Sequence, residues 1–128
     1  MTMRQSIAAA QTGELRADAT GAMTVEFRFG AGDPVFAGHF PQRPILPGVY
    51  QLELARVVAE QALGCSLFVR EISRAKFQQP IQPDETVRVD LILSEKDGIV
   101  QARAGFSVGG RAAGETTLLL CRNDSKNG

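Results

Sequence analysis

The 128-residue sequence is poor in several kinds of residue, and each scarcity argues against a class of protein. Fourteen basic and fourteen acidic residues cancel, so the chain lacks the positive field that binds nucleic-acid phosphates or an anionic membrane surface. Its two cysteines, Cys65 and Cys121, stand far apart with no Cys-x-x-Cys or Cys/His cluster. This spacing argues against a zinc site and a disulfide framework, and we expect two buried thiols in a reducing compartment.

Long hydrophobic runs are also missing. The longest, at 118–120, is far too short to cross a bilayer, and the first residues lack the pattern of a targeting segment. We therefore expect a cytoplasmic protein that binds neither membrane nor nucleic acid. A hydrophobic content of 44% is typical of a globular chain. The length predicts one domain over residues 1–121, followed by a disordered tail over 122–128.

Alternation of apolar and polar residues predicts most of the strands. It is strict over 23–29, which indicates a half-buried strand. We expect frayed residues at 1–5 and a strand over 6–18, because Thr12-Gly13 would interrupt a helix there. Four later strands are predicted over 66–77, 87–94, 100–108 and 112–121. The last three are separated by two hairpin turns, at Asp97-Gly98 and Gly109-Gly110.

One long helix is predicted over 49–63. Pro47 suits the first helical position, and Gly64 suits the residue just past the last turn. The apolar stripe facing the sheet is expected at positions 49, 52, 55 or 56, 59, 62 and 63. A single helix on an antiparallel sheet of five or six strands is an α+β fold. Its exposed edges and apolar surface lead us to expect a homodimer.

The most informative stretch is 38–48, which holds the only histidine and three of the six prolines. Histidine has an ordinary pKa of about 6.5, so His39 can act as a general base near neutral pH. Gly48 is the first residue of the helix that offers a free backbone N–H, because Pro47 has none. Since it also lacks a Cβ, Gly48 is a candidate donor to an oxyanion. The prolines stiffen the loop and fix His39.

Glu53 is the third candidate for chemistry. It lies roughly 7.5 Å along the helix axis from Gly48 at about 1.5 Å per residue, inside an apolar stripe that would keep part of it protonated as an acid. A structural alternative is equally visible. Glu53 could pair with Arg56 at i+3, and Arg56 with Glu60 at i+4, on a solvated helix face.

Residues 36–49, with Glu53 fourteen positions after His39, resemble the motif of the beta-hydroxyacyl-acyl-carrier-protein dehydratases (the FabZ/FabA group) of the hot-dog fold. A second run, Lys-Phe-Gln-Gln-Pro-Ile-Gln-Pro at 76–83, is similar to the Lys-Phe-Arg-Arg-Pro-Val-x-Pro run of that family. The resemblance implies a long helix wrapped by a curved sheet, a homodimer with shared active sites, and a pantetheine-linked acyl substrate. It implies that His39 of one subunit works with Glu53 of the other, without metal or redox cofactor.

Candidate substrate contacts are Phe40, Pro47, Val49 and Tyr50, with a core role open for Phe40 and Tyr50. The expected reaction is dehydration of 3-hydroxyacyl groups on acyl carrier protein to trans-2-enoyl products, in fatty-acid or related polyene synthesis. A hot-dog thioesterase and a catalytically silent acyl-binding domain are the alternatives. Candidate residues for docking the acidic carrier protein are Arg43, Arg70, Arg74 and Lys76.

Three departures from the housekeeping enzymes stand out. Val57 replaces an expected glutamine, Gln78-Gln79 replaces two arginines, and Asp84 replaces a glycine. The run Pro-Gly-Val-x-Gln-Leu-acid at 47–53 is more similar to the accessory dehydratases of aryl-polyene-type gene clusters, which commonly have aspartate where Glu53 stands.

Overall fold

The computed structural model describes residues 2–36 and 44–123. In chain order the elements are α1 (Met3–Ala10), β1 (Arg16–Ala17), β2 (Met23–Arg28), the 3-10 turn η1 (Pro34–Phe36), α2 (Gly48–Leu63), β3 (Leu67–Phe77), β4 (Thr86–Lys96), β5 (Ile99–Val108) and β6 (Arg111–Arg122). The six strands form one antiparallel sheet in the order β1-β2-β4-β5-β6-β3.

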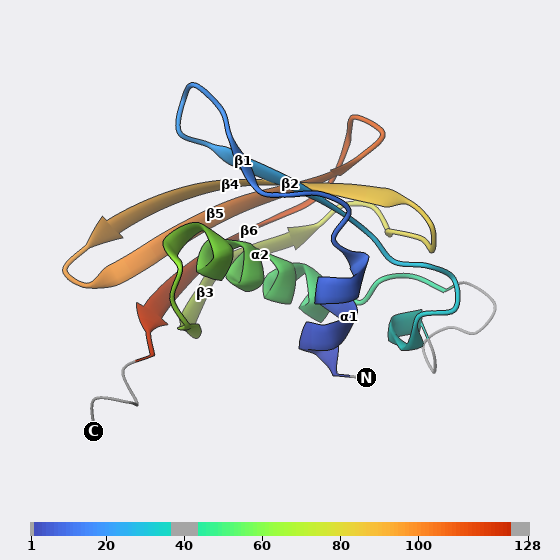
Figure 1. Cartoon of the computed structure of the whole chain (residues 1–128), viewed down its shortest axis with the longest axis horizontal. Coiled ribbons are helices and arrows are strands. Elements are labelled where there is room, and N and C mark those ends of the chain that lie inside the picture. The colour runs from blue at the N-terminus through green and yellow to red at the C-terminus, as the bar shows by residue number, and fades with distance from the viewer. Residues whose placement is uncertain (1, 37–43, 124–128) are drawn as a thin grey trace.

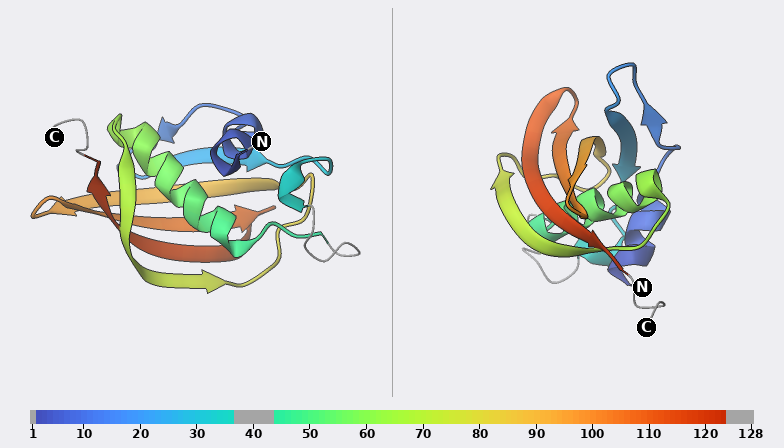
Figure 2. Two further views of the ribbon diagram at one scale, coloured as in Figure 1. Left: turned by 90° about the horizontal axis from the view of Figure 1, so that it is seen from below. Right: turned by 90° about the vertical axis from the view of Figure 1, so that its left-hand side faces the viewer.

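The sheet curls around α2, which lies against its concave face (Figures 1 and 2). α2 contacts β3, β4, β5 and β6, and α1 packs beside α2 and β2. A long helix wrapped by a curved antiparallel sheet is the predicted α+β architecture. The observed strand number is six, within the predicted range.

The strand predictions from alternation are confirmed. Val87, Val89 and Leu91 on β4 are fully buried, whereas the residues between them are wholly or partly exposed. Asp97 and Gly98 both have positive φ, 54° and 79°, as a two-residue hairpin between twisted strands requires. Local turn chemistry and period-two patterning therefore set β4, β5 and β6.

The prediction for the N-terminus is wrong, because α1 replaces the expected frayed end and strand. Thr2 caps α1 by accepting a hydrogen bond from the Gln5 N–H at 3.1 Å, and Gln5 Oε1 accepts one from the Thr2 N–H at 2.8 Å. Ile7 and Ala10 are buried against the core. Of the predicted strand over 6–18, the two residues of β1 are what the structure retains.

The limits of α2 match the prediction to within one residue, but its buried face does not. Pro47 is the N-cap, and Gly64 ends the helix with φ 67°. Val49, on the predicted buried stripe, is 53% exposed. The buried residues are Gln51, Leu54, Ala55, Val57, Val58 and Ala59. The sheet thus covers a face of α2 that is rotated from the predicted one.

The two cysteines also differ from the prediction, since Cys65 and Cys121 are half-buried rather than buried.

β3 is an edge strand whose side chains are almost uncovered. It pairs with β6 on one side, and every residue after Leu67 in this strand is exposed. Its large apolar side chains that stay exposed are Phe68, Val69, Ile72 and Phe77. An edge of this kind is a template for pairing with another chain. None of the described helices is long and apolar enough to span a membrane.

Candidate functional site

The predicted base, His39, lies outside the described residues, as do Phe40 and Arg43. The described residues resume at position 44, and Leu46 anchors this segment to the core. Leu46 is 3% exposed, and its N–H donates to the Ile81 carbonyl at 2.7 Å. This hydrogen bond ties the segment before α2 to the loop after β3.

A pocket of about 290 Å³ lies at the start of α2, where the two sequence motifs meet. The first motif contributes residues before and within the helix, and the second contributes the end of β3 and the residues after it. The lining residues are Ile45, Leu46, Gly48, Gln51, Phe77, Gln78, Gln79 and Pro80. The fold therefore joins segments about thirty residues apart in sequence into one concave site, largely apolar with few polar groups.

Gly48 opens α2 and lines this pocket. No described residue accepts a hydrogen bond from its N–H, which is the normal state of a first helical residue and leaves a donor at the positive end of the helix dipole. A Cβ on Gly48 would lie 2.8 Å from the Phe77 ring. A larger residue at 48 would therefore have to push the half-exposed Phe77 ring aside, a packing reason for glycine in addition to the predicted chemical one.

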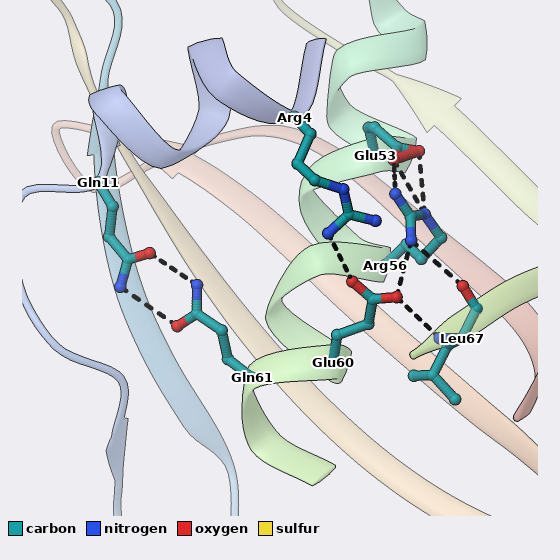
Figure 3. A network of polar contacts seen from close by, with 7 residues as sticks. All are labelled: Arg4, Gln11, Glu53, Arg56, Glu60, Gln61 and Leu67. Atoms are coloured by element: carbon teal, nitrogen blue, oxygen red, sulfur yellow. Dashed lines mark hydrogen bonds and ion pairs between the residues drawn. The ribbon is translucent and has the colours of Figure 1, made fainter. Parts of the chain in front are cut away.

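Glu53 is not among the residues that line the pocket. It faces Arg56, whose Nε lies 2.9 Å from Oε1 and 3.1 Å from Oε2 of Glu53 (Figure 3). The Arg56 Nη2 also donates to Glu53. Both carboxylate oxygens of Glu53 therefore accept hydrogen bonds from one guanidinium. These contacts are the Glu53–Arg56 pair of the structural alternative, and the predicted acid role of Glu53 stays a prediction.

Arg56 is the centre of a larger network that ties three elements together. Its Nη1 donates to Glu60 at 2.9 Å and to the Leu67 carbonyl at 3.2 Å. Glu60 accepts from the Leu67 N–H at 2.7 Å and from Arg4 of α1 at 3.1 Å (Figure 3). Hydrogen bonding to Glu53 raises the pKa of Arg56, against the opposing effect of burial. The side chains of Glu53, Arg56 and Glu60 are 23%, 13% and 11% exposed, so this face is not solvated as the alternative supposed.

The described candidates for substrate contact are Tyr50, which packs in the core, and Val49 and Pro47, which do not. Tyr50 packs against Phe29 edge to face, with ring centroids 6.1 Å apart, and is part of the core boundary. Burial, with a smaller effect from the charge of Asp33, raises the pKa of Tyr50. Val49 points away from its own core, and Pro47 caps the helix through a carbonyl that accepts from the Tyr50 N–H at 2.9 Å.

Gln51 is the pocket residue that the sequence prediction missed. It is 2% exposed, and its Oε1 has no hydrogen-bond partner among the described residues. A signal was present, because Gln51 precedes Leu54, Ala55 and Val58 at the spacing i+3, i+4 and i+7 of a buried helix face. The predicted buried stripe began at Val49 and therefore did not include Gln51.

Three of the predicted carrier-docking residues are described, and all three lie on β3. Arg70 and Lys76 are exposed, and Arg74 pairs with Glu115 at 2.7 Å. Within residues 2–36 and 44–123, no group of three His, Cys, Asp or Glu side chains is placed to hold a metal ion.

Comparison with known proteins gives matches to dehydratases in sequence and in structure. A family model for ApeI-like proteins, described as ApeI dehydratase, matches residues 15–114. The chain is 33% identical over 72 residues to the 3-hydroxyacyl-[acyl-carrier-protein] dehydratase FabZ of Rickettsia massiliae (strain Mtu5), a match that covers 50% of each chain. The aligned part thus spans about half the length of this curated relative.

Two solved structures illustrate the fold. A chain of the dehydratase heterocomplex ApeI:P from Xenorhabdus doucetiae superimposes with a TM-score of 0.72 at 27% identity, over 85% of this chain and 95% of that chain. A hypothetical thioesterase with coenzyme A from Streptococcus pneumoniae TIGR4 superimposes with a TM-score of 0.70 at 11% identity, over 94% of both, which shows the shared hot-dog fold alone. The family match extends across both motifs and the pocket between them, and on that basis the chain belongs to the ApeI-like dehydratase family.

Proposed function

We propose that this protein dehydrates 3-hydroxyacyl thioesters carried by acyl carrier protein to trans-2-enoyl thioesters. The observation that carries the proposal is the family match over residues 15–114, which includes His39, Gly48 and Glu53. The FabZ relative bears the name of this reaction. The largely apolar pocket beside the start of α2 suits an acyl group next to an N–H donor.

The proposed chemistry needs three groups. His39 takes the C2 proton, the electron pair forms the C2=C3 double bond, and the C3–O bond breaks. The Gly48 N–H stabilises the negative charge that develops on the thioester oxygen. The departing hydroxyl gains a proton and leaves as water, so the acid is either Glu53 or the imidazolium just formed at His39.

The Arg56 contact bears on that choice. With both of its oxygens bonded to Arg56, Glu53 acts in this proposal by orienting the reacting groups, and the proton comes from His39. The two carboxylate oxygens that accept from Arg56 favour this version. Arg56 is accordingly a positioning residue in the proposal, since Glu60 and the Leu67 carbonyl hold it in turn.

We further propose a homodimer in which Glu53 of the partner subunit completes each site. Glu53 is not among the residues of its own chain that line the pocket, and β3 leaves a row of apolar side chains uncovered at the sheet edge. The solved relative from Xenorhabdus doucetiae is a heterocomplex, so a different hot-dog chain in place of the second copy is the competing outcome.

The reaction is tested with the full chain and crotonyl thioesters of acyl carrier protein, followed by loss of the enoyl absorbance on hydration. His39→Ala should lower the rate by at least about 100-fold, because a positioned general base contributes about 10²–10⁴. The variant should keep the dimer and the thermal midpoint. Release of free thiol by the wild-type protein would instead indicate a thioesterase, and neither activity would indicate a silent acyl-binding domain.

The shared site is tested by mixing two inactive variants, His39→Ala and Glu53→Gln. If each site takes one residue from each subunit, about half of the dimers in an equal mixture are heterodimers with one intact site each, and about a quarter of the wild-type activity returns. Ile72→Glu on β3 should give monomers in sedimentation and abolish activity. Ile92→Glu is the matched control, because Ile72 and Ile92 are 49% and 51% exposed, but Ile92 lies on a central strand. Dimers of Ile72→Glu, or no recovery on mixing, would contradict the proposal.

A further inference from the structure

The side-chain carbonyl of Gln51 is a buried acceptor that nothing in the described structure satisfies. Burying such a group without a partner is unfavourable and uncommon in native proteins, where it marks strain, a functional role, or a partner such as a ligand, an ion or a bound water. Gln51 lines the pocket at the start of α2 together with Gly48. Its position therefore combines a pocket, a helix start and an unpaired acceptor.

The surroundings of Gln51 leave room for its amide. Gly114 lies within β6, where glycine weakens a strand. A Cβ on Gly114 would lie 2.6 Å from the Gln51 Oε1 and 2.9 Å from the Lys76 carbonyl oxygen. Any larger residue at 114 would displace the Gln51 amide or the β3 backbone. The glycine thus preserves the space in which the amide sits.

A ligand in the pocket can supply the donor that this acceptor lacks within the described chain. Gly48 and Gln51 are three residues apart on one helix face, a spacing at which Cβ atoms lie about 5–6 Å apart. A thioester oxygen at the Gly48 N–H would place the C1–C2–C3 segment of a 3-hydroxyacyl group along this face. The hydroxyl on C3 is the donor nearest the reacting carbons. Gln78 and Gln79 also line the pocket, but Gln51 is the buried one of the three glutamines.

We propose that the Gln51 amide turns from Gly114 toward the pocket and accepts the 3-hydroxyl of the substrate, so that Gln51 is the specificity-determining residue that selects 3-hydroxyacyl over saturated acyl thioesters. This inference rests on the proposed function for the identity of the substrate class. A site built to bond a hydroxyl rejects the analogue that lacks it, because the buried acceptor is then left unpaired. The matching saturated acyl group gains nothing from Gln51.

The test measures binding of 3-hydroxybutyryl-CoA and butyryl-CoA by calorimetry. Both are bound to the His39→Ala protein, so that the first is not turned over. The two ligands share every amide of the pantetheine arm of coenzyme A and differ only in the 3-hydroxyl. We expect the hydroxylated ligand to bind at least about 10-fold more tightly, and Gln51→Met in the same background to reduce that ratio to about one. Gln61→Met is the matched control, since Gln61 is exposed on the same helix and bonds Gln11.

Equal affinity of the parent protein for both ligands would overturn the proposal, as would an unchanged ratio in Gln51→Met. If Gln51→Met weakened the binding of both ligands equally, the Gln51 side-chain oxygen would bond an amide of the pantetheine arm instead, and the proposal would also be overturned.

Thermal unfolding provides a second test. Gln51→Met should unfold at the same or a higher temperature, because an unpaired acceptor is removed. A fall of several degrees would show that the amide has a structural partner instead. A preference for the hydroxyl in a wild-type protein without dehydratase activity would leave this inference standing while the proposed function failed.

Discussion

Two groups of polar side chains on α2 differ in how completely they are bonded. On one face, Arg56 contacts two glutamates and a backbone carbonyl, and Glu60 accepts from Arg4 and from the Leu67 N–H. On the other face, the side-chain oxygen of Gln51 has no hydrogen-bond partner in the described structure. Both groups are largely buried, so solvent exposure does not explain the difference.

The difference separates structural from ligand-binding roles. A polar network whose donors and acceptors are satisfied stabilises the arrangement of the elements it joins, here α1, α2 and the start of β3. A buried acceptor without a partner reduces stability unless a ligand completes it. Substitutions in the two groups should therefore have opposite effects on the unfolding free energy.

The largest effect on stability is expected for Arg56→Met. It leaves two partly buried carboxylates without their counter-charge, and we expect a loss of about 2 kcal/mol in the free energy of unfolding. This lies below the value for fully buried pairs because the side chains retain some solvent contact. Urea denaturation monitored by circular dichroism measures it. Arg4→Met is the control, because Arg4 is 59% exposed and should contribute under about 1 kcal/mol. Equal losses in the two variants would contradict a central role for Arg56.

A smaller effect, of the opposite sign, is expected for Gln51→Met. The free energy of unfolding should stay the same or rise by up to about 1 kcal/mol, since methionine fills similar space without a buried acceptor. The measurement is the same urea titration, run beside Arg56→Met. If both substitutions destabilised the protein equally, the contrast between the two faces would be lost.

The smallest effect is expected at the exposed pair Glu95–Arg122, which joins β4 to the end of β6. The hydrogen bond from Arg122 lowers the pKa of Glu95 below its ordinary value of 4.5. The pair thus stabilises the fold above the unfolded-state pKa and loses this contribution as pH falls through the folded-state pKa. Glu95→Gln should slightly reduce the dependence of the thermal midpoint on pH below 4.5, an effect screened by about 1 M salt. A large shift at neutral pH would mean that this pair is more than a solvated contact.

Much of the fold could be predicted from local patterns. The hairpins at Asp97-Gly98 and Gly109-Gly110 follow from the need for positive φ, and the limits of α2 follow from Pro47 and Gly64. The helix α1 was missed because its eight residues are held by a cap at Thr2 and by burial of Ile7 against the core. Short helices of this kind depend on tertiary packing more than on propensity.

The candidate site divides in the same way. The sequence contains the family motif, which predicts His39 as the base and Gly48 as an N–H donor, because such predictions depend on residue type and spacing along the chain. The tertiary structure decided which face of α2 the sheet covers, since a helix that is apolar on several sides can bury more than one of them. That choice buried Gln51 in the pocket with Gly48, directed Glu53 to Arg56, and left the apolar side chains of β3 uncovered at the sheet edge.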